Sequence, residues 1–227
     1  MTPSREHFQS RHRPRRMEAH MKVTIVGAGN MGFALASQLT RAGHRVTVTS
    51  RNPEKGREVA RTVGATFEDK ASAKDVDVVI VATGYGDAVE ALRNVGDLEG
   101  KVVVDITNPL TPDYMGLAIG HDTSAAEEIQ KAFPAAKVVK AFNTVFAQVL
   151  GDGPALAGAT VPVFYAGNDP EAKETVAALI RSIGFTAVDA GGLPNARYLE
   201  PVAGLNIYLG YGAGRGTAIA PAWIGVR

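Results

Sequence analysis

Three glycines near the start of the chain have the spacing of a phosphate-binding loop. Gly27, Gly29 and Gly32 form the pattern G-x-G-x-x-G directly after a run of β-branched residues. Between a strand and a helix, such a loop turns tightly, lets the backbone approach a pyrophosphate and packs the helix closely on the strand. Free N–H groups at the start of that helix then face the negative charge. We expect the amides of Asn30 and Met31, and the Asn30 side chain, to contribute to a dinucleotide site.

The end of the second predicted strand indicates which dinucleotide is bound. NAD-binding loops carry an acidic residue near this point, which accepts hydrogen bonds from the ribose 2′-hydroxyl. Here the strand ends with Ser50, Arg51 and Asn52, and no carboxylate is present to repel a phosphate. A guanidinium is a planar, permanently charged partner for a phosphate, and Ser50 or Asn52 offers a neutral donor. We therefore expect NADPH rather than NADH, with its 2′-phosphate beside these residues.

Two further strand ends fall at the edge of the sheet where open α/β folds bind their ligands. Thr83 follows one strand and Asn108 follows the next. Either side chain could contact the nicotinamide or simply close a turn, and the sequence leaves both roles open. Asp105, at the end of a buried strand, is predicted to be a structural hydrogen-bond acceptor.

The chain offers few groups that could move a proton beside the nicotinamide. His44 lies in a predicted turn, where we expect it to be solvated, and His121 lies in a loop that either approaches the site or faces water. Lys140 stands on a predicted strand and could face solvent at a sheet edge. No metal-ligand spacing or nucleophile elbow is present, so we expect no catalytic side chain and no metal. Hydride transfer between two bound redox cofactors suits such a site, because it needs positioning more than acid–base help.

From Lys22 onward, short β-branched runs alternate with longer segments of helical periodicity, which is typical of βαβ units and a parallel sheet. The predicted strands are 23–26, 45–49, 77–82, 101–105, 138–141, 161–166 and 186–189. The predicted helices are 30–42, 53–63, 87–95, 124–133, 170–184 and 193–209, and 210–216 is predicted as a glycine-rich loop. The fold class expected is a Rossmann-type, doubly wound, mostly parallel α/β sheet with a small C-terminal extension.

Three segments differ in character. Residues 1–20 contain five Arg and two Glu without apolar periodicity, and are predicted to be a basic, disordered tail. Residues 21–144 form the predicted NADP-binding Rossmann domain. Residues 145–227 are expected to continue the sheet and to close the cofactor cleft.

Composition limits the partners. The chain has no Cys, which excludes disulfides and thiolate metal sites and fits a reducing cytoplasm, where we expect the protein to act. Beyond the basic tail the chain is slightly acidic, which argues against nucleic acid, and no apolar window approaches the roughly 20 residues of a membrane span. Leu205, Ile207 and Leu209 on the last predicted helix could form a homodimer interface.

Several segments together resemble the family of NADPH-dependent reductases of the 8-hydroxy-5-deazaflavin coenzyme F420. The matching segments are 26–32, 49–51, 105–110, Lys140-Ala141-Phe142-Asn143-Thr144 and 199–201, which span nearly all of 22–211. The resemblance implies hydride exchange between NADPH and the deazaflavin. It also implies that a common set of residues lies near the redox centre: Thr83, Asn108, Ala141, Asn143 and Thr144.

The segment 140–144 is also similar to the reductase domain of membrane metalloreductases, which pass electrons from NADPH to an ordinary flavin. FMN or FAD is therefore the alternative second cofactor. Two other functions stay open: an NADP-sensing module without turnover, and a reductase of a small organic substrate. Enzymes of the latter kind need a large helical C-terminal domain, whereas only 38 residues follow Asp189.

Overall fold

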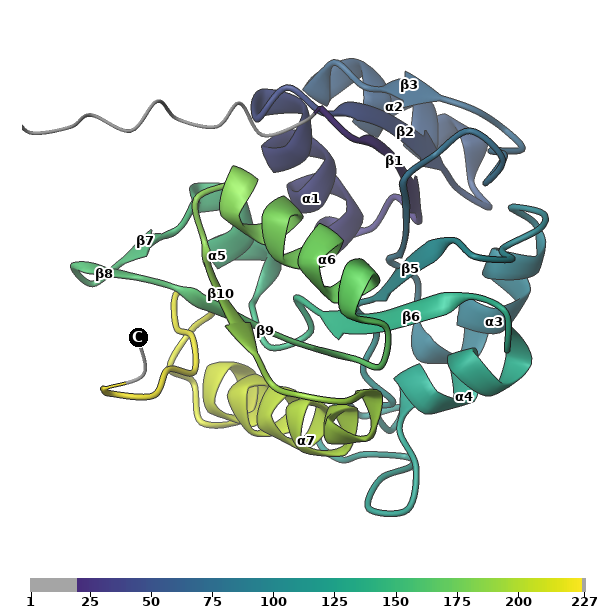
Figure 1. Cartoon of the computed structure of the whole chain (residues 1–227). Helices are drawn as coiled ribbons and strands as arrows, with labels where there is room; N and C mark the ends of the chain where they lie inside the picture. Colours follow the sequence, from purple (N-terminus) through teal and green to yellow (C-terminus); the bar gives the residue numbers. More distant parts are fainter. Residues whose placement is uncertain (1–19, 226–227) are drawn as a thin grey trace, which may run out of the picture.

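The computed structural model describes residues 20–225. The predicted basic tail therefore lies almost entirely outside the described residues. The described part contains one large sheet with helices on both faces, and one two-stranded hairpin (Figure 1).

Eight strands form the sheet, in the order β10-β9-β6-β5-β4-β1-β2-β3. Their bounds are β1 (Lys22–Val26), β2 (Arg45–Thr49), β3 (Thr66–Phe67), β4 (Val78–Val81), β5 (Val102–Asp105), β6 (Lys137–Ala141), β9 (Pro162–Gly167) and β10 (Thr186–Asp189). The stretch β3-β2-β1-β4-β5-β6 is parallel and has the strand order of a dinucleotide-binding Rossmann sheet. The predicted fold class is confirmed.

Beyond β6 the sheet changes direction, because β9 pairs with β6 in antiparallel fashion and β10 runs parallel to β9. The hairpin of β7 (Ala155–Leu156) and β8 (Ala159–Thr160) precedes this reversal. Strand β6 is consequently an interior strand, paired on both sides. The sequence pattern did not predict the reversal, the hairpin or the two-residue β3.

The helices lie on the two faces of the sheet and enclose two large cores, and a small third cluster contains Phe164, Ala166 and Leu199. Their bounds are α1 (Asn30–Arg41), α2 (Pro53–Val63), α3 (Tyr85–Arg93), α4 (Ala125–Ala132), α5 (Ala147–Asp152), α6 (Pro170–Ser182) and α7 (Ala196–Ile207). Buried residues of α1, α2, α5 and α6 pack in one core, and those of α3, α4 and the start of α7 pack in the other. Interior strands such as β4 are buried along their whole length, as expected for a parallel sheet covered on both sides.

Local sequence signals set where three of the helices, α2, α4 and α6, begin. Pro53 and Pro170 are the first residues of α2 and α6, and the side chains of Asn52 and Asp169 cap them. Ser124 caps α4 by accepting the Glu127 amide, as the predicted capping box requires. The predicted glycine-rich loop 210–216 starts inside a π-helical turn, Tyr208–Gly212, which follows α7 directly. At the other end of α7, a 3₁₀ turn at Leu193–Asn195 leads into the helix.

The prediction that His44 is solvated is wrong. Its ring is buried, with 6% of the residue exposed. The Met21 amide donates to Nδ1 at 3.0 Å, and Nε2 lies 2.8 Å from the Ser182 hydroxyl of α6. The ring therefore joins the start of β1 to a helix 138 residues away in sequence.

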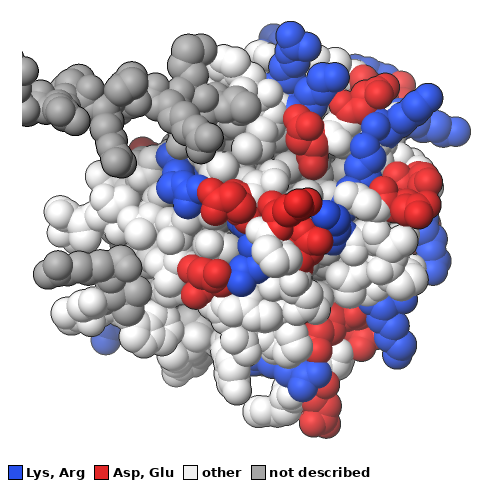
Figure 2. All heavy atoms as spheres, viewed as in Figure 1, with Lys and Arg blue, Asp and Glu red and all other residues white. Residues whose placement is uncertain are grey.

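On the face seen in Figure 2, Lys and Arg are interspersed with Asp and Glu, and the side toward β7, β8 and the end of the described chain is largely uncharged. None of the helices in residues 20–225 combines the length and apolar composition needed to cross a membrane.

Candidate functional site

The glycine loop lies between β1 and α1, and two of its glycines are required by packing. A Cβ on Gly32 would stand 2.1 Å from the Gly27 carbonyl oxygen, and one on Gly27 would stand 2.4 Å from that of Ala82. Gly27 also has a φ of 126°, which side-chain-bearing residues rarely adopt. Gly29 differs, because no atom of residues 20–225 beyond its own chain neighbours lies within 4 Å of the position of its Cβ. The space in front of Gly29 is open to a ligand.

The first turn of α1 presents amide groups toward that open space. Gly29 is the N-cap residue, no side chain caps the helix, and the first turn holds no acidic residue. The first N–H groups of a helix have no partner within the helix, and its dipole favours negative charge at this end. Asn30 is exposed and Met31 is half-buried. This end of α1 has the features of an anion-binding site.

The three residues after β2 lie on the surface in contact with one another. The Ser50 hydroxyl accepts the Asn52 amide at 3.3 Å, and Asn52 uses its side-chain oxygen to cap α2 through the Lys55 amide. Arg51 is highly exposed, with one guanidinium nitrogen 3.2 Å from the carboxylate of Asp87 in α3. Such an exposed ion pair is weak, so the guanidinium stays available to another anion.

Asp87 is an acidic neighbour that sequence reasoning missed. It lies 36 residues from Arg51, and it reaches Arg51 because β1 alone separates β2 from β4 in the sheet. The helix that follows β4 therefore starts beside the end of β2.

At the carboxyl edge of β4, Thr83 donates to the Gly84 carbonyl at 3.0 Å. At the neighbouring edge of β5 and β6, the side chains of Asn108 and Asn143 hold each other. Asn108 Nδ2 donates to the Asn143 carbonyl, and Asn143 Nδ2 donates to Asn108 Oδ1, both at 3.0 Å. The structure thus brings together two predicted site residues from separate strands.

The residues after β6 combine backbone strain with unused hydrogen-bonding atoms. Phe142 is fully buried and has a φ of 61°, an outlier for a bulky residue. Next to it, Asn143 Oδ1 and Thr144 Oγ1 are buried without a partner among residues 20–225, as is Thr107 Oγ1 after β5. Buried polar atoms are nearly always paired, and strained backbone gathers at functional sites. Ala141 is fully buried, so neither its side chain nor its backbone reaches the surface.

Lys140 does not face solvent at a sheet edge, which the sequence had left as one alternative. Its side chain is fully buried, with Nζ 2.8 Å from Asp105, 2.7 Å from Glu200 and 2.5 Å from the Thr107 carbonyl. Asp105 also accepts the Thr107 amide at 2.8 Å, which is the structural role predicted for it. The ammonium group therefore has three oxygen partners, two from the end of β5 and one from α7.

Glu200 of α7 is the member of this cluster that sequence reasoning missed. Besides Lys140, it accepts the amides of Ala125 and Ala126, at 3.0 and 3.4 Å, in the first turn of α4. Burial raises the pKa of Glu200, and the nearby Lys140 ammonium opposes that shift. The available signal was a single carboxylate on the apolar face of a helix that otherwise buries Leu199 and Ala203.

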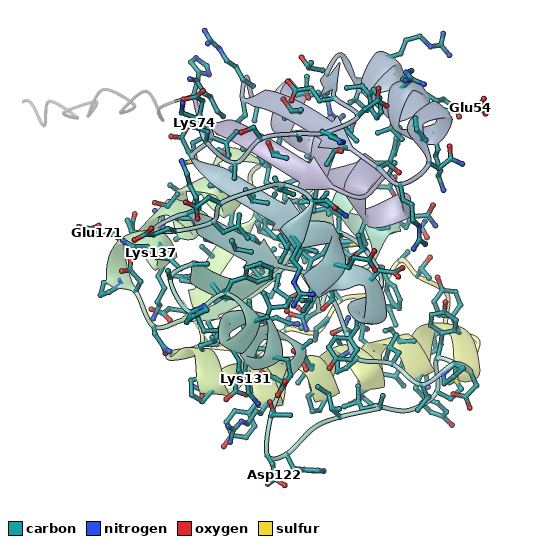
Figure 3. The ribbon with its side chains drawn as sticks, turned by 90° about the vertical axis from the view of Figure 1, so that its right-hand side faces the viewer. Glu54, Lys74, Asp122, Lys131, Lys137 and Glu171 are labelled. Carbon is teal, nitrogen blue, oxygen red and sulfur yellow. The ribbon has the colours of Figure 1, made fainter. Side chains whose placement is uncertain are left out.

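A hollow of 720 Å³ lies at the amino-terminal end of β6, and its lining includes charged side chains of Lys131, Lys137 and Asp169. Lys137 is 3.1 Å from Asp169 and 3.5 Å from Glu171. Figure 3 shows Lys137 and Glu171 side by side, with Asp122 at the tip of a loop. These charges satisfy one another, and the predicted site residues lie at the other end of the strands. His121, next to Asp122, is exposed.

Comparison with known proteins identifies relatives that share most of this fold. The model of the family "NADP oxidoreductase coenzyme F420-dependent" matches residues 22–109. The F420-dependent NADP reductase of Methanothermobacter marburgensis is 30% identical over 83% of this chain and 92% of its own length. A crystal structure of a candidate F420-dependent NADP reductase from Arthrobacter sp. superposes with a TM-score of 0.80 and 32% identity, over 89% of this chain and all of the other.

A second kind of relative is larger. Metalloreductase STEAP3 of Rattus norvegicus is 35% identical over 80% of this chain but over only 36% of its own length. The chain thus spans about a third of the metalloreductases that it matches.

Proposed function

The chain belongs to the family of F420-dependent NADP reductases, which are oxidoreductases, and we propose that it transfers a hydride between NADPH and a deazaflavin of the F420 type. The observation that carries this proposal is the group of unpaired polar atoms on residues 143 and 144, next to the carboxyl edge where the Rossmann fold binds its ligand.

In this proposal the glycine loop holds the pyrophosphate. Gly27 and Gly32 keep the turn tight, Gly29 leaves room for the phosphates, and the amides of Asn30 and Met31 donate to them. The absence of a capping side chain on α1 supports this role, because the end of the helix is free for an external anion.

The adenosine 2′-phosphate would lie against Ser50, Arg51 and Asn52. Arg51 would supply the charge, and its exposed pair with Asp87 would have to open or be shared. The Nδ2 group of Asn52 can donate while its Oδ1 caps α2. These contacts would favour NADPH over NADH.

At the nicotinamide end, Asn143 Oδ1 is an acceptor without a donor and Thr144 Oγ1 can donate or accept. A carboxamide carries both complementary groups, so the residues present fit that part of the coenzyme. Asn108 holds Asn143 in place, Thr83 would form part of the wall, and the fully buried Ala141 would lie behind it. Bound NADPH would supply the hydride and the deazaflavin would accept it, while the chain orients the two and excludes water.

Ordinary flavin, FMN or FAD, is the second candidate acceptor, and the likeness to the metalloreductase favours it. We further propose that residues 145–227, which continue the sheet of 21–144, form a C-terminal subregion that closes the cleft, and that the protein acts in the cytoplasm. Leu205 is exposed on α7, with Ile207 and Leu209 partly so, which supports a homodimer through this helix.

Mixing the protein with NADPH and either F420, FMN or FAD, and following the loss of NADPH absorbance, tests the function. We expect rapid oxidation with F420 and much slower oxidation when NADH replaces NADPH. Turnover with FMN or FAD alone would select the second candidate. Tight NADPH binding without turnover would overturn the enzymatic proposal in favour of a sensing module.

A further inference from the structure

Helix α7 is fastened to the rest of the molecule through polar groups on its buried face. This face contains Leu199, Glu200 and Asn206, while Tyr198 and Leu205 of the same helix are exposed. A helix that packed through apolar contacts alone would not need a buried carboxylate and a buried amide. Each of these groups has a specific partner on another element.

Glu200 occupies a point where three donors converge. These are the Lys140 ammonium and the amides of Ala125 and Ala126. The N-terminus of α4 favours a negative charge here, and so does Lys140. Because Lys140 also binds Asp105 and the Thr107 carbonyl, Glu200 connects α7 to the ends of two strands and to α4.

Two other bonds connect α7 to the loop after β6. Asn143 Nδ2 donates to the Leu199 carbonyl at 3.0 Å, and Asn206 Nδ2 donates to the Thr144 carbonyl at 3.1 Å. Phe142, directly before Asn143 and Thr144, has the left-handed φ of 61°. The position of α7 therefore controls where Asn143 and Thr144 hold their unpaired oxygens.

We propose that Glu200 is a positioning residue, which holds α7 on Lys140 and α4 and thereby keeps residues 142–144 in the conformation that receives the nicotinamide end of the coenzyme. This inference rests on the proposed NADPH site. It assigns no contact between Glu200 and the coenzyme, so its effect reaches the ligand through the loop.

The same two helices carry a matched control. Arg197 of α7 makes two bonds to Glu127 of α4, at 2.8 and 2.6 Å, one turn away from Glu200. This pair is partly exposed and does not touch Lys140 or the loop 142–144. Removing this pair loosens the contact between α4 and α7 but leaves the three donors to Glu200 in place.

Glu200→Gln keeps the size of the side chain but replaces one acceptor oxygen by a donor. With three donors converging, the new NH2 group must oppose at least one of them. Two ligands distinguish the nicotinamide end of the site from the adenosine end. NADP would contact both ends, whereas 2′-phospho-ADP-ribose lacks the nicotinamide. Titration calorimetry of wild type, Glu200→Gln and Arg197→Gln measures both without turnover.

We expect Glu200→Gln to weaken the binding of NADP by about tenfold, which corresponds to the loss of roughly one net hydrogen bond. The affinity for 2′-phospho-ADP-ribose should stay unchanged. Arg197→Gln should change neither. Unchanged NADP affinity in Glu200→Gln, or equal weakening of both ligands, would overturn the inference. Failure of the wild type to bind either ligand would instead refute the proposed coenzyme site.

Asn206→Ala provides a second route that disturbs no buried charge, in case Glu200→Gln does not fold. It removes the bond to the Thr144 carbonyl. The inference requires the same selective loss for NADP, and an unselective loss or none would contradict it.

Discussion

The two ends of the proposed coenzyme site are built differently. At the adenosine end, 22–52 form one continuous stretch in which backbone amides, glycines and exposed side chains do the work. At the nicotinamide end, Asp105, Lys140 and Glu200 come from three elements and are buried. The Glu200 contact with α4 joins residues 75 positions apart.

This difference implies that binding and stability are separable at one end and coupled at the other. An exposed group such as Arg51 can be replaced without disturbing the core, since surface substitutions usually change stability little. A buried ion cluster cannot, because removing one member leaves the others unpaired in a medium of low dielectric.

Lys140→Met should give the largest effect. It would leave Asp105 and Glu200 as two buried carboxylates without their cation. We expect the free energy of unfolding to fall by about 3–5 kcal/mol, measured by urea denaturation. The control is Lys137→Met, which breaks a partly exposed pair on the same strand. An equally large loss in the control would remove the distinction between buried and exposed charges.

Gly32→Ala should have the second largest effect. Its Cβ would meet the Gly27 carbonyl oxygen at 2.1 Å, and we expect overpacking to lower stability by about 1–3 kcal/mol. The new Cβ of Gly29→Ala meets nothing within 4 Å, so this variant should keep its stability and lose only its affinity for NADPH. Thermal melting with and without NADPH distinguishes the two variants. Normal NADPH affinity in Gly29→Ala would contradict the proposed approach of the phosphates.

Arg51→Gln should weaken the binding of NADPH by about tenfold, or ~1.4 kcal/mol, and leave the binding of NADH unchanged. Arg57→Gln is a matched control, because Arg57 also forms an exposed pair, 3.2 Å from Asp69. Dissociation constants for both coenzymes, measured by fluorescence titration, test this. Parallel loss of NADPH and NADH binding would mean that Arg51 does not contact the 2′-phosphate.

The smallest expected effect concerns the sign of the pH dependence. Burial raises the pKa of Glu200, so its contribution to stability is complete below its ordinary value of 4.5 and is lost as pH rises through the raised pKa. Burial also acts to raise the pKa of Glu127, but hydrogen bonds from Arg197 and Ser124 outweigh it and lower the pKa. Its contribution is present above 4.5 and is lost as pH falls through the lowered pKa.

Unfolding free energies of wild type, Glu200→Gln and Glu127→Gln on both sides of pH 4.5 test these signs. The advantage of wild type over Glu200→Gln should shrink as pH rises, and that over Glu127→Gln should grow. The same trend in both variants would show that burial does not dominate at Glu200.

The amino-acid sequence by itself determined the strand–helix alternation, the glycine loop and most helix starts. Pro53, Pro170 and the pair Ser124 and Glu127 act on backbone within four residues, so their effect can be read locally. Gly27 and Gly32 were likewise predictable, because the βα turn forces the chain against itself. The sequence alone also shows that residues 50–52 contain no acidic side chain.

Only the tertiary structure decided which distant groups meet. The burial of His44, the approach of Asp87 to Arg51 and the enclosure of Lys140 depend on strand order and on the antiparallel pairing of β9 with β6. An edge strand would have left Lys140 in water, whereas an interior strand requires partners for its charge. Strand periodicity shows which side chains alternate, but it does not show which strand lies beside which, and these partners follow from that order.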